Sequence, residues 1–198
     1  MRRVLCAALV IGLLPPSLAA AQGAPPAASL LGGAPIAGLC MLSQQEVLTR
    51  AKVGQAATAR LQVLAQQAQN EVTAERGPID ADAKALQAQR ATLKPADFQE
   101  KQNALQGRAQ ALQQKANVRT RQIELTRQKA LARISVDAQP VIAAVYKAHN
   151  CGLLVDRGSV LGGNMSNDLT AGVIDALDAK ITTITFDREP LPAAALAH

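Results

Sequence analysis

The residues best suited to covalent or acid–base chemistry are few and isolated in this chain. His149, Asn150 and Cys151 form the one place where a base adjoins a possible nucleophile, and the other histidine is the C-terminal His198. Adjacent residues rarely point at a common atom, because catalytic triads are assembled in space from separate elements. A favourable His at a helix C-terminus, followed by a buried Cys, explains the same residues without catalysis. The sequence therefore indicates no nucleophilic site.

Carboxylates and metal ligands give the same result. Asp156 and Asp168 could be paired carboxylates, but Asp156 suits a turn after a strand and Asp168 suits a helix start. The sequence contains no Gly-rich phosphate loop and no cluster with metal-ligand spacing. We therefore expect a protein that is not an enzyme, with no catalytic residue, no cofactor and no metal.

Basic residues suggest binding instead. Residues 51–134 hold 14 Lys and Arg against 7 Asp and Glu, and residues 101–133 hold 8 against 1, with Glu124 the exception. A solvated helical face would explain such a bias, but the scarcity of acids removes the i,i+4 pairs that usually neutralise one. A positive helical face raises the local concentration of acidic partners. We therefore take as candidate contacts Lys101, Arg108, Lys115, Arg119, Arg121 and Arg127.

Residues 1–21 are typical of a signal peptide. Two arginines at positions 2 and 3 precede an apolar run over residues 4–14, and three alanines at 19–21 suit signal peptidase. The run is shorter than the roughly 20 residues that a bilayer requires, which argues against an anchor. Residues 22–35 carry no charge and are mostly Ala, Pro and Gly, so we expect a disordered leader. We therefore expect cleavage before Gln22 and a soluble chain outside the cytoplasm.

Two cysteines, Cys40 and Cys151, would remain after export. In an oxidising compartment they could pair and close a loop of about 110 residues, which the chain-entropy account values at roughly 4.7 kcal/mol. Each could instead be a small buried hydrophobe on its own strand. Both alternatives stay open, because the sequence does not show whether the two Cα atoms lie within the roughly 4.4 to 6.8 Å that a disulfide requires.

The element that must carry the basic residues is a long helical hairpin. Residues 51–134 contain no Trp, Tyr, Cys or His and are rich in Ala, Gln, Leu, Lys, Arg and Glu, which supply only a narrow apolar stripe. Apolar residues recur at sevens, which predicts a left-handed supercoil. The outgoing series is Ala65, Val72, Ile79, Leu86 and Leu93, and the return series is Phe98, Leu105 and Leu112.

Three features modify this hairpin. Pro95 separates the two helices and lies near the tip of the arm. Glu75 and Asp82 interrupt a companion apolar series, so we expect a weak seam. Gly77 and Pro78 lie in mid-arm, where Pro78 lacks a donor and a kink or a full break could form. We take Gly77 and Pro78 as a possible hinge.

The remaining segments predict a small mixed body. Apolar runs predict strands over residues 36–41, 153–155, 159–161 and 181–186. The sequence from Ser43 to Glu46 is a capping box that starts a helix, residues 140–149 read as the last turns of a helix, and residues 168–177 as a short one. We expect residues 188–198 to form a loose tail.

Two of these segments resemble parts of a known protein family. The apolar segment 36–41 stands directly before the Gln- and Lys-rich hairpin, and Leu-Leu-Val-Asp at 153–156 is followed by Asp-Leu-Thr-Ala-Gly-Val at 168–173. A hydrophobic strand that ends in Asp, then a hairpin, then D-[IL]-T-x-x-[VI] at a helix start is similar to the closing signature of the Skp/OmpH family of periplasmic chaperones. The resemblance covers residues 36–180 and does not extend to the residues after Lys180.

The resemblance implies an α+β fold, with a long antiparallel helical hairpin on a small β-rich trimerisation body. A single domain would span residues 36–187, with the arm at 56–134 and the body at 36–55 and 135–187. Three arms of a homotrimer would surround a cavity. The residues expected to form the trimer body are Ile36, Leu39, Leu153, Val155, Val160, Val173 and Ile174.

The function implied is that of a periplasmic holdase that needs no ATP and shelters unfolded outer-membrane proteins. The basic arm would also suit anionic lipid or lipopolysaccharide. Two alternatives come from other classes: a structural coiled-coil spacer of the envelope, and a binder of nucleic acid or another anionic polymer. We expect no nucleic acid, because the basic residues are not interleaved with aromatic side chains that could stack on bases.

Overall fold

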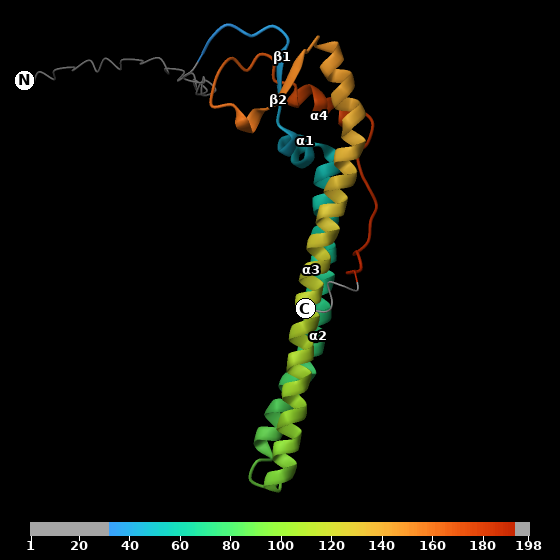
Figure 1. The fold of residues 1–198 in the computed structure, drawn as a ribbon. Coiled ribbons are helices and arrows are strands. Elements are labelled where there is room, and N and C mark those ends of the chain that lie inside the picture. The colour runs from blue at the N-terminus through green and yellow to red at the C-terminus, as the bar shows by residue number, and fades with distance from the viewer. Residues whose placement is uncertain (1–31, 193–198) are drawn as a thin grey trace, which may run out of the picture.

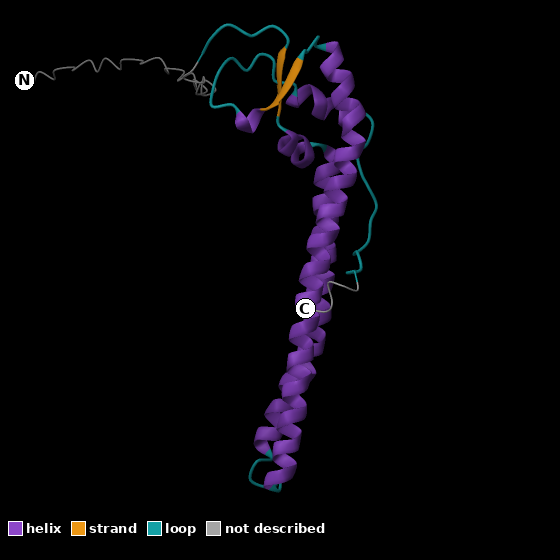
Figure 2. Ribbon diagram, in the orientation of Figure 1, coloured by secondary structure: helices purple, strands orange, loops and turns teal. Residues whose placement is uncertain are grey.

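The computed structural model describes residues 32–192 and consists of a small body from which one long two-helix arm projects (Figure 1). The signal peptide expected at 1–21 and most of the leader expected at 22–35 lie outside the described residues. In chain order the elements are β1 (Leu39–Leu42), α1 (Gln44–Arg50), α2 (Lys52–Ala88), α3 (Pro95–Ala148), β2 (Leu153–Asp156), the 3-10 turn η1 (Arg157–Ser159) and α4 (Thr170–Asp178). Helices dominate, and the two short strands lie together in the body (Figure 2).

The two strands are parallel neighbours, with Leu39 opposite Leu153 and Met41 opposite Val155. Parallel pairing needs a long crossover connection, and here the whole hairpin supplies it. On its other side β1 bonds the segment before α4: the Met41 N–H donates to the Asn167 carbonyl at 3.0 Å. The outer edge of β2 has no strand partner within the described residues.

Two expected strands are absent from the described residues. Residues 157–159 form η1 instead of leading into a strand at 159–161, because the Asp156 carboxylate accepts the Gly158 N–H at 2.7 Å and closes a turn. Residues 181–186 are irregular and lie along the helices, where Ile184 is buried. Ile184 belongs to the core cluster and Ile181 and Phe186 pack against it, whereas no strand of the described residues pairs with this segment.

The arm is formed by α2, of 37 residues, and α3, of 54 residues. At about 1.5 Å per residue these helices are about 55 Å and about 80 Å long, so α3 continues past the arm into the body. The expected boundary near residue 134 therefore falls inside one continuous helix. Pro95 opens α3 at its first turn, as expected, whereas α2 runs unbroken through Pro78, so the full break considered there is wrong.

The hydrophobic core lies where the base of the arm meets α1 and α4. Its fully buried members include Val47, Ile134, Val141, Val173 and Leu177. A disulfide joins Cys40 to Cys151, with the two Cα atoms 5.8 Å apart, and so fastens β1 to the residues that lead into β2. The body thus has a core of its own within one protomer.

The turn between α1 and α2 was not expected from sequence. Ala51 is extended, with ψ 146°, and is both the C-cap of α1 and the N-cap of α2. The chain turns so tightly that a Cβ on Gly54 would lie 1.8 Å from the Leu48 carbonyl oxygen. Gly54 is therefore required by close approach of backbone to backbone.

Replacing Gly54 by Ala should lower the free energy of unfolding by about 1 to 3 kcal/mol, because a buried helix junction must open to admit the methyl group. The matched control is Gly107→Ala on α3, where nothing lies within 4 Å of the added atom. That change should raise stability by about 1 kcal/mol through helix propensity alone. Urea unfolding followed by circular dichroism measures both, and equal effects of the two substitutions would contradict the close approach at Gly54.

Candidate functional site

Three ion pairs cross the arm from α2 to α3. Arg119 Nε lies 2.7 Å from a Glu71 carboxylate oxygen and Arg108 Nη1 lies 2.6 Å from Asp82, while Lys115 pairs with Glu75 between them. The residue numbers of every pair have the same sum, as antiparallel helices in one register require. We call these three pairs the ion-pair ladder.

The ladder corrects two expectations from sequence. Glu75 and Asp82 do not weaken the seam, because each is matched by a base on the returning helix. The apparent lack of acids near the basic residues of α3 is likewise wrong, since the acids come from α2 and not from the next turn of the same helix. Ala65, expected on the seam, is exposed, and Leu64 and Ala68 are buried in its place.

The six candidate contact residues are thus divided by the structure. Arg108, Lys115 and Arg119 belong to the ladder, and Arg127 pairs with Glu124 one turn away on α3 at 2.9 Å. Lys101 lies near the tip beside a hollow lined by Leu86, Leu105 and the Asp82–Arg108 pair. Arg121 lies on α3, half-way along the arm.

The ladder sets the register of the hairpin more than it stabilises it. Its side chains keep about a quarter to a half of their surface exposed, from 24% for Arg119 to 55% for Asp82. Ion pairs this exposed generally contribute only about 0 to 1 kcal/mol each, and salt weakens them. A carboxylate from another molecule could therefore replace an internal partner at little cost.

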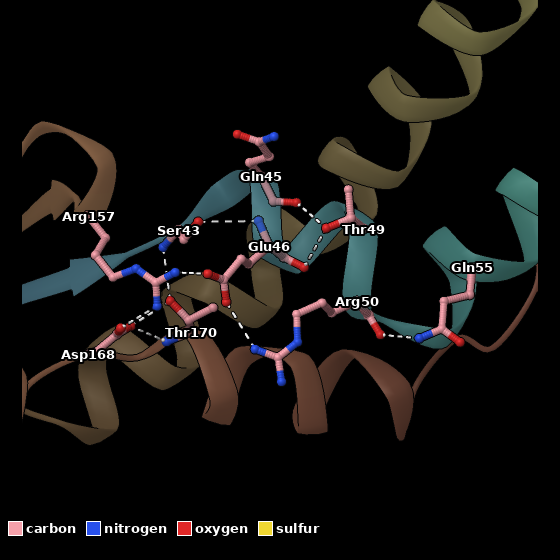
Figure 3. Close-up of polar contacts among 9 residues, drawn as sticks. All are labelled: Ser43, Gln45, Glu46, Thr49, Arg50, Gln55, Arg157, Asp168 and Thr170. Carbon is pink, nitrogen blue, oxygen red and sulfur yellow. Dashed lines mark hydrogen bonds and ion pairs between the residues drawn. The ribbon is translucent and has the colours of Figure 1, made fainter. Parts of the chain in front are cut away.

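A second polar cluster fastens the body together around Arg157 (Figure 3). Its guanidinium lies between two acids, pairing with Glu46 of α1 and with Asp168 at 2.9 Å. The Ser43 hydroxyl accepts the Glu46 N–H at 3.3 Å, as the capping box predicts. The other half of the box differs: the Ser43 N–H donates to the Thr170 hydroxyl at 2.9 Å, which leaves the Glu46 carboxylate for Arg50 and Arg157. One arginine thus joins the starts of α1 and α4.

Asp168 is the acid of this cluster whose ionisation the fold favours. Burial by itself would raise the pKa of the Asp168 carboxyl. Hydrogen bonds from the Thr170 hydroxyl and N–H, and the charge and hydrogen bond of Arg157, outweigh that and lower the pKa. The folded pKa lies below the unfolded value of about 3.9, so ionised Asp168 stabilises the fold fully above that pH. This contribution is lost as pH falls through the folded pKa.

Asp168→Asn should therefore make the melting temperature depend less on pH under acid conditions. We expect the melting temperature of the parent to fall more steeply than that of the variant below about pH 4, so that the two converge. Thr170→Val removes one hydrogen-bond donor to Asp168, so the stability that ionised Asp168 contributes should be lost at a higher pH than in the parent. Thermal melts at half-unit pH steps measure this, and parallel curves for parent and Asp168→Asn would contradict the role of Asp168.

The residues expected to form the trimer body fall into two groups. Val173 and Ile174 are buried in the core of the protomer, so they belong to the body through its own core and not through an exposed surface. Ile36 and Leu153 are 64% and 58% exposed, and Leu39, Val155 and Val160 line a shallow cavity beside the sheet. Leu161 and Met165 are also exposed nearby and were missed, although apolar residues in a Gly-rich loop are a signal of exposure. The body therefore presents an apolar surface around the free edge of β2, which we call the β2-edge surface.

The C-terminal residues 181–192 also differ from expectation. Arg188 and Glu189, part of the tail expected to be loose, are bound to the arm, whereas residues 193–198 lie outside the described part of the chain. Arg188 pairs with Glu71 at 3.0 Å, and Lys129 pairs with Glu189 at 2.7 Å. The hydrogen bond from Arg188, assisted by the charges of Arg188 and Arg119, lowers the pKa of Glu71 against the opposing effect of burial.

None of the helices within residues 32–192 combines the length and apolar content that crossing a bilayer requires. No three His, Cys, Asp or Glu side chains in the same range are grouped as metal ligands would be.

Comparison with known proteins gives consistent matches. The family model for outer membrane protein (OmpH-like) matches residues 38–177. A crystal structure of a proposed OmpH-like outer membrane chaperone from Caulobacter crescentus is similar, with 39% sequence identity and a TM-score of 0.75. The similarity covers 80% of this chain and 94% of that one. No curated protein matches the chain.

Proposed function

Because this chain belongs to the OmpH-like family, we propose that it is a periplasmic chaperone that holds unfolded outer-membrane proteins without consuming ATP. The observation that carries the proposal is the separation of an apolar body surface from a long arm. A two-helix arm of about 55 Å leaves the body as a free projection, while the β2-edge surface remains uncovered. Such an arrangement suits assembly through the body and capture by the arms.

We propose that the assembly is a homotrimer joined through the β2-edge surface. Leu153, Leu161 and Ile36 would cost free energy if left in water, since burying a large apolar side chain generally contributes about 1.5 to 3 kcal/mol. The free strand edge next to them also offers unpaired backbone groups. Three arms that start from one body would enclose a space between them, into which an unfolded chain could enter.

Client contacts on the arm would be many and weak. We propose that the six basic residues on α3 are client contacts. The ladder pairs among them are exposed enough for a carboxylate of the client to replace the carboxylate from α2. Shallow apolar hollows between α2 and α3, such as that lined by Ala65, Val72 and Ile123, would hold apolar side chains. A joint at Gly77 and Pro78, where α2 lacks one backbone hydrogen bond, would let the arm adapt to client size.

Suppression of porin aggregation tests the proposal. A urea-unfolded porin diluted into buffer without nucleotide should scatter light when alone and remain clear with three chains of this protein per porin. Retention of a DNA duplex at moderate salt is the companion measurement. A protein that retains DNA but leaves porin aggregation unchanged would contradict the holdase and favour an anionic-polymer binder.

Charge should govern capture without governing the fold. Changing Lys101, Arg121 and Arg127 to Gln spares the ladder, so helicity should stay within error while retention of acidic unfolded porin weakens several-fold. Added salt should weaken retention by the parent in the same direction, since exposed charges are screened over roughly 10 Å at 0.1 M. The matched control changes Lys52, Lys147 and Lys180, which lie in the body, to Gln. Equal loss in both triple variants would mean that net charge, not the arm, governs capture.

A further inference from the structure

The C-terminal segment is bound to the arm as an extended peptide would be bound to a receptor. Figure 1 shows it in red, descending from the body alongside the upper part of the arm. It contacts residues of both helices at once: Arg60 and Glu71 from α2, and Thr126, Lys129 and Arg133 from α3. We call these five residues the proximal arm surface.

Three of these contacts involve the backbone of the segment and not its side chains. Arg60 Nε donates to the Phe186 carbonyl at 3.1 Å, and Arg133 donates to the Thr185 carbonyl at 3.4 Å. The Glu189 N–H donates to the Thr126 hydroxyl at 2.9 Å. Backbone groups are the same in every polypeptide, so these contacts are available to any extended chain with a free N–H at the right place.

The side chains of the segment alternate between the arm and solvent. Ile184 is buried, Phe186 and Arg188 are half-buried, and Thr185 and Asp187 between them are exposed, whereas Glu189 is half-buried next to Arg188. Over residues 184–188 this period of two is that of an extended chain with one face against the arm, and the apolar members of that face are Ile184 and Phe186. Transmembrane β-strands show the same alternation, with aromatic residues among the outward-facing ones.

Thr126 shows that the arm is built to be covered at this point. It is only 1% exposed and lies on α3 next to other buried residues of the arm, such as Ala130 and, on α2, Leu64. Its hydroxyl donates to the Gln122 carbonyl at 2.6 Å and accepts from Glu189, so the segment supplies the second partner of a buried hydroxyl. Thr120, one and a half turns away, makes the same bond back to its own helix but remains exposed.

We propose that the proximal arm surface is a binding site for an extended segment of an unfolded polypeptide with apolar residues at alternate positions. Residues 184–189 of the chain itself occupy this site and act as an intramolecular competitor that a client displaces. The proposal rests on the proposed function and names one of its client sites. A tethered competitor acts at an effective concentration in the millimolar range, so a client segment must outcompete it to bind.

A labelled synthetic peptide that copies residues 182–190 is the probe. The full chain with Phe186→Ser and Arg188→Ser, which weakens the tethered segment, should bind the peptide at least about tenfold more tightly than the parent does. Adding Thr126→Val to that variant should reverse the gain, whereas adding Thr120→Val should not. A peptide of equal composition with Ile and Phe adjacent should bind weakly, because its apolar residues no longer share one face.

A second measurement uses the parent chain without substitutions. Millimolar peptide should speed hydrogen exchange at the Glu189 amide, which is bonded to the Thr126 hydroxyl, because the tethered segment is displaced. Unchanged exchange, or no gain in peptide affinity for the Phe186→Ser, Arg188→Ser variant with the helicity of the parent, would overturn the proposal that the segment is a competitor. Urea-unfolded porin should displace the bound peptide from the variant. If porin is held in solution but does not displace the peptide, this site fails as a client site while the holdase function stands.

Discussion

Replacing Cys40 and Cys151 together by Ser should lower the free energy of unfolding by roughly 4.7 kcal/mol, the value that chain entropy assigns to a loop of about 100 residues. The two cysteines are 111 positions apart in sequence, and the loop between them contains both arm helices. The disulfide joins β1 to Cys151, two residues before β2. Without it, the unfolded chain regains the conformational freedom that closing this loop removes. Urea unfolding followed by circular dichroism at 222 nm measures the loss.

The single substitutions provide the control for this result. Cys40→Ser and Cys151→Ser each break the bond, so each should cost nearly as much as the double substitution. Treating the parent with a reductant should produce a similar loss without any change of sequence. Losses below about 1 kcal/mol in all three cases would mean that the cysteines act only as small buried hydrophobes.

Leu153→Asp should convert the assembly to single protomers. Leu153 is 58% exposed in the protomer, at the free edge of β2, so the fold of one chain does not depend on it. In an association through the β2-edge surface the same residue would be buried, and an unpaired carboxylate there costs several kcal/mol. Sedimentation at micromolar concentration should show mass falling to one third while most of the helicity is kept.

The matched control for Leu153→Asp is Val63→Asp, which places the same charge on an exposed apolar residue of the arm, 48% exposed. That variant should keep the mass of the parent. Dissociation by Val63→Asp, or an unchanged mass for Leu153→Asp, would place the interface elsewhere than the β2-edge surface.

The arm could be predicted from sequence because its information is local. Helix-favouring composition, apolar residues at helical spacing and Pro95 at the turn are each visible within a few residues. The ion-pair ladder could not be predicted in the same way, because Glu71 and Arg119 are brought together only by the register of the hairpin. Reading α3 alone therefore made its basic residues look unpartnered.

The body and the C-terminal segment were less predictable for a related reason. The turn at Ala51 depends on the close approach of Leu48 to Gly54, which no local pattern announces. Residues 181–186 are rich in β-branched residues, as a strand would be, and sequence cannot distinguish pairing with a strand from packing on helices. Leu161 was expected in a strand at 159–161 that the structure does not contain, and Met165 follows it in the same loop, so the exposure of both residues accompanies the missing strand.

The native mass of a mixture of this protein with a urea-unfolded porin, recorded without nucleotide, shows whether the chain assembles into a trimer that holds a client. We expect a soluble complex of three copies of this chain with one porin. A mass of one chain alone, with the porin lost to aggregation, would contradict both the assembly and the holdase function.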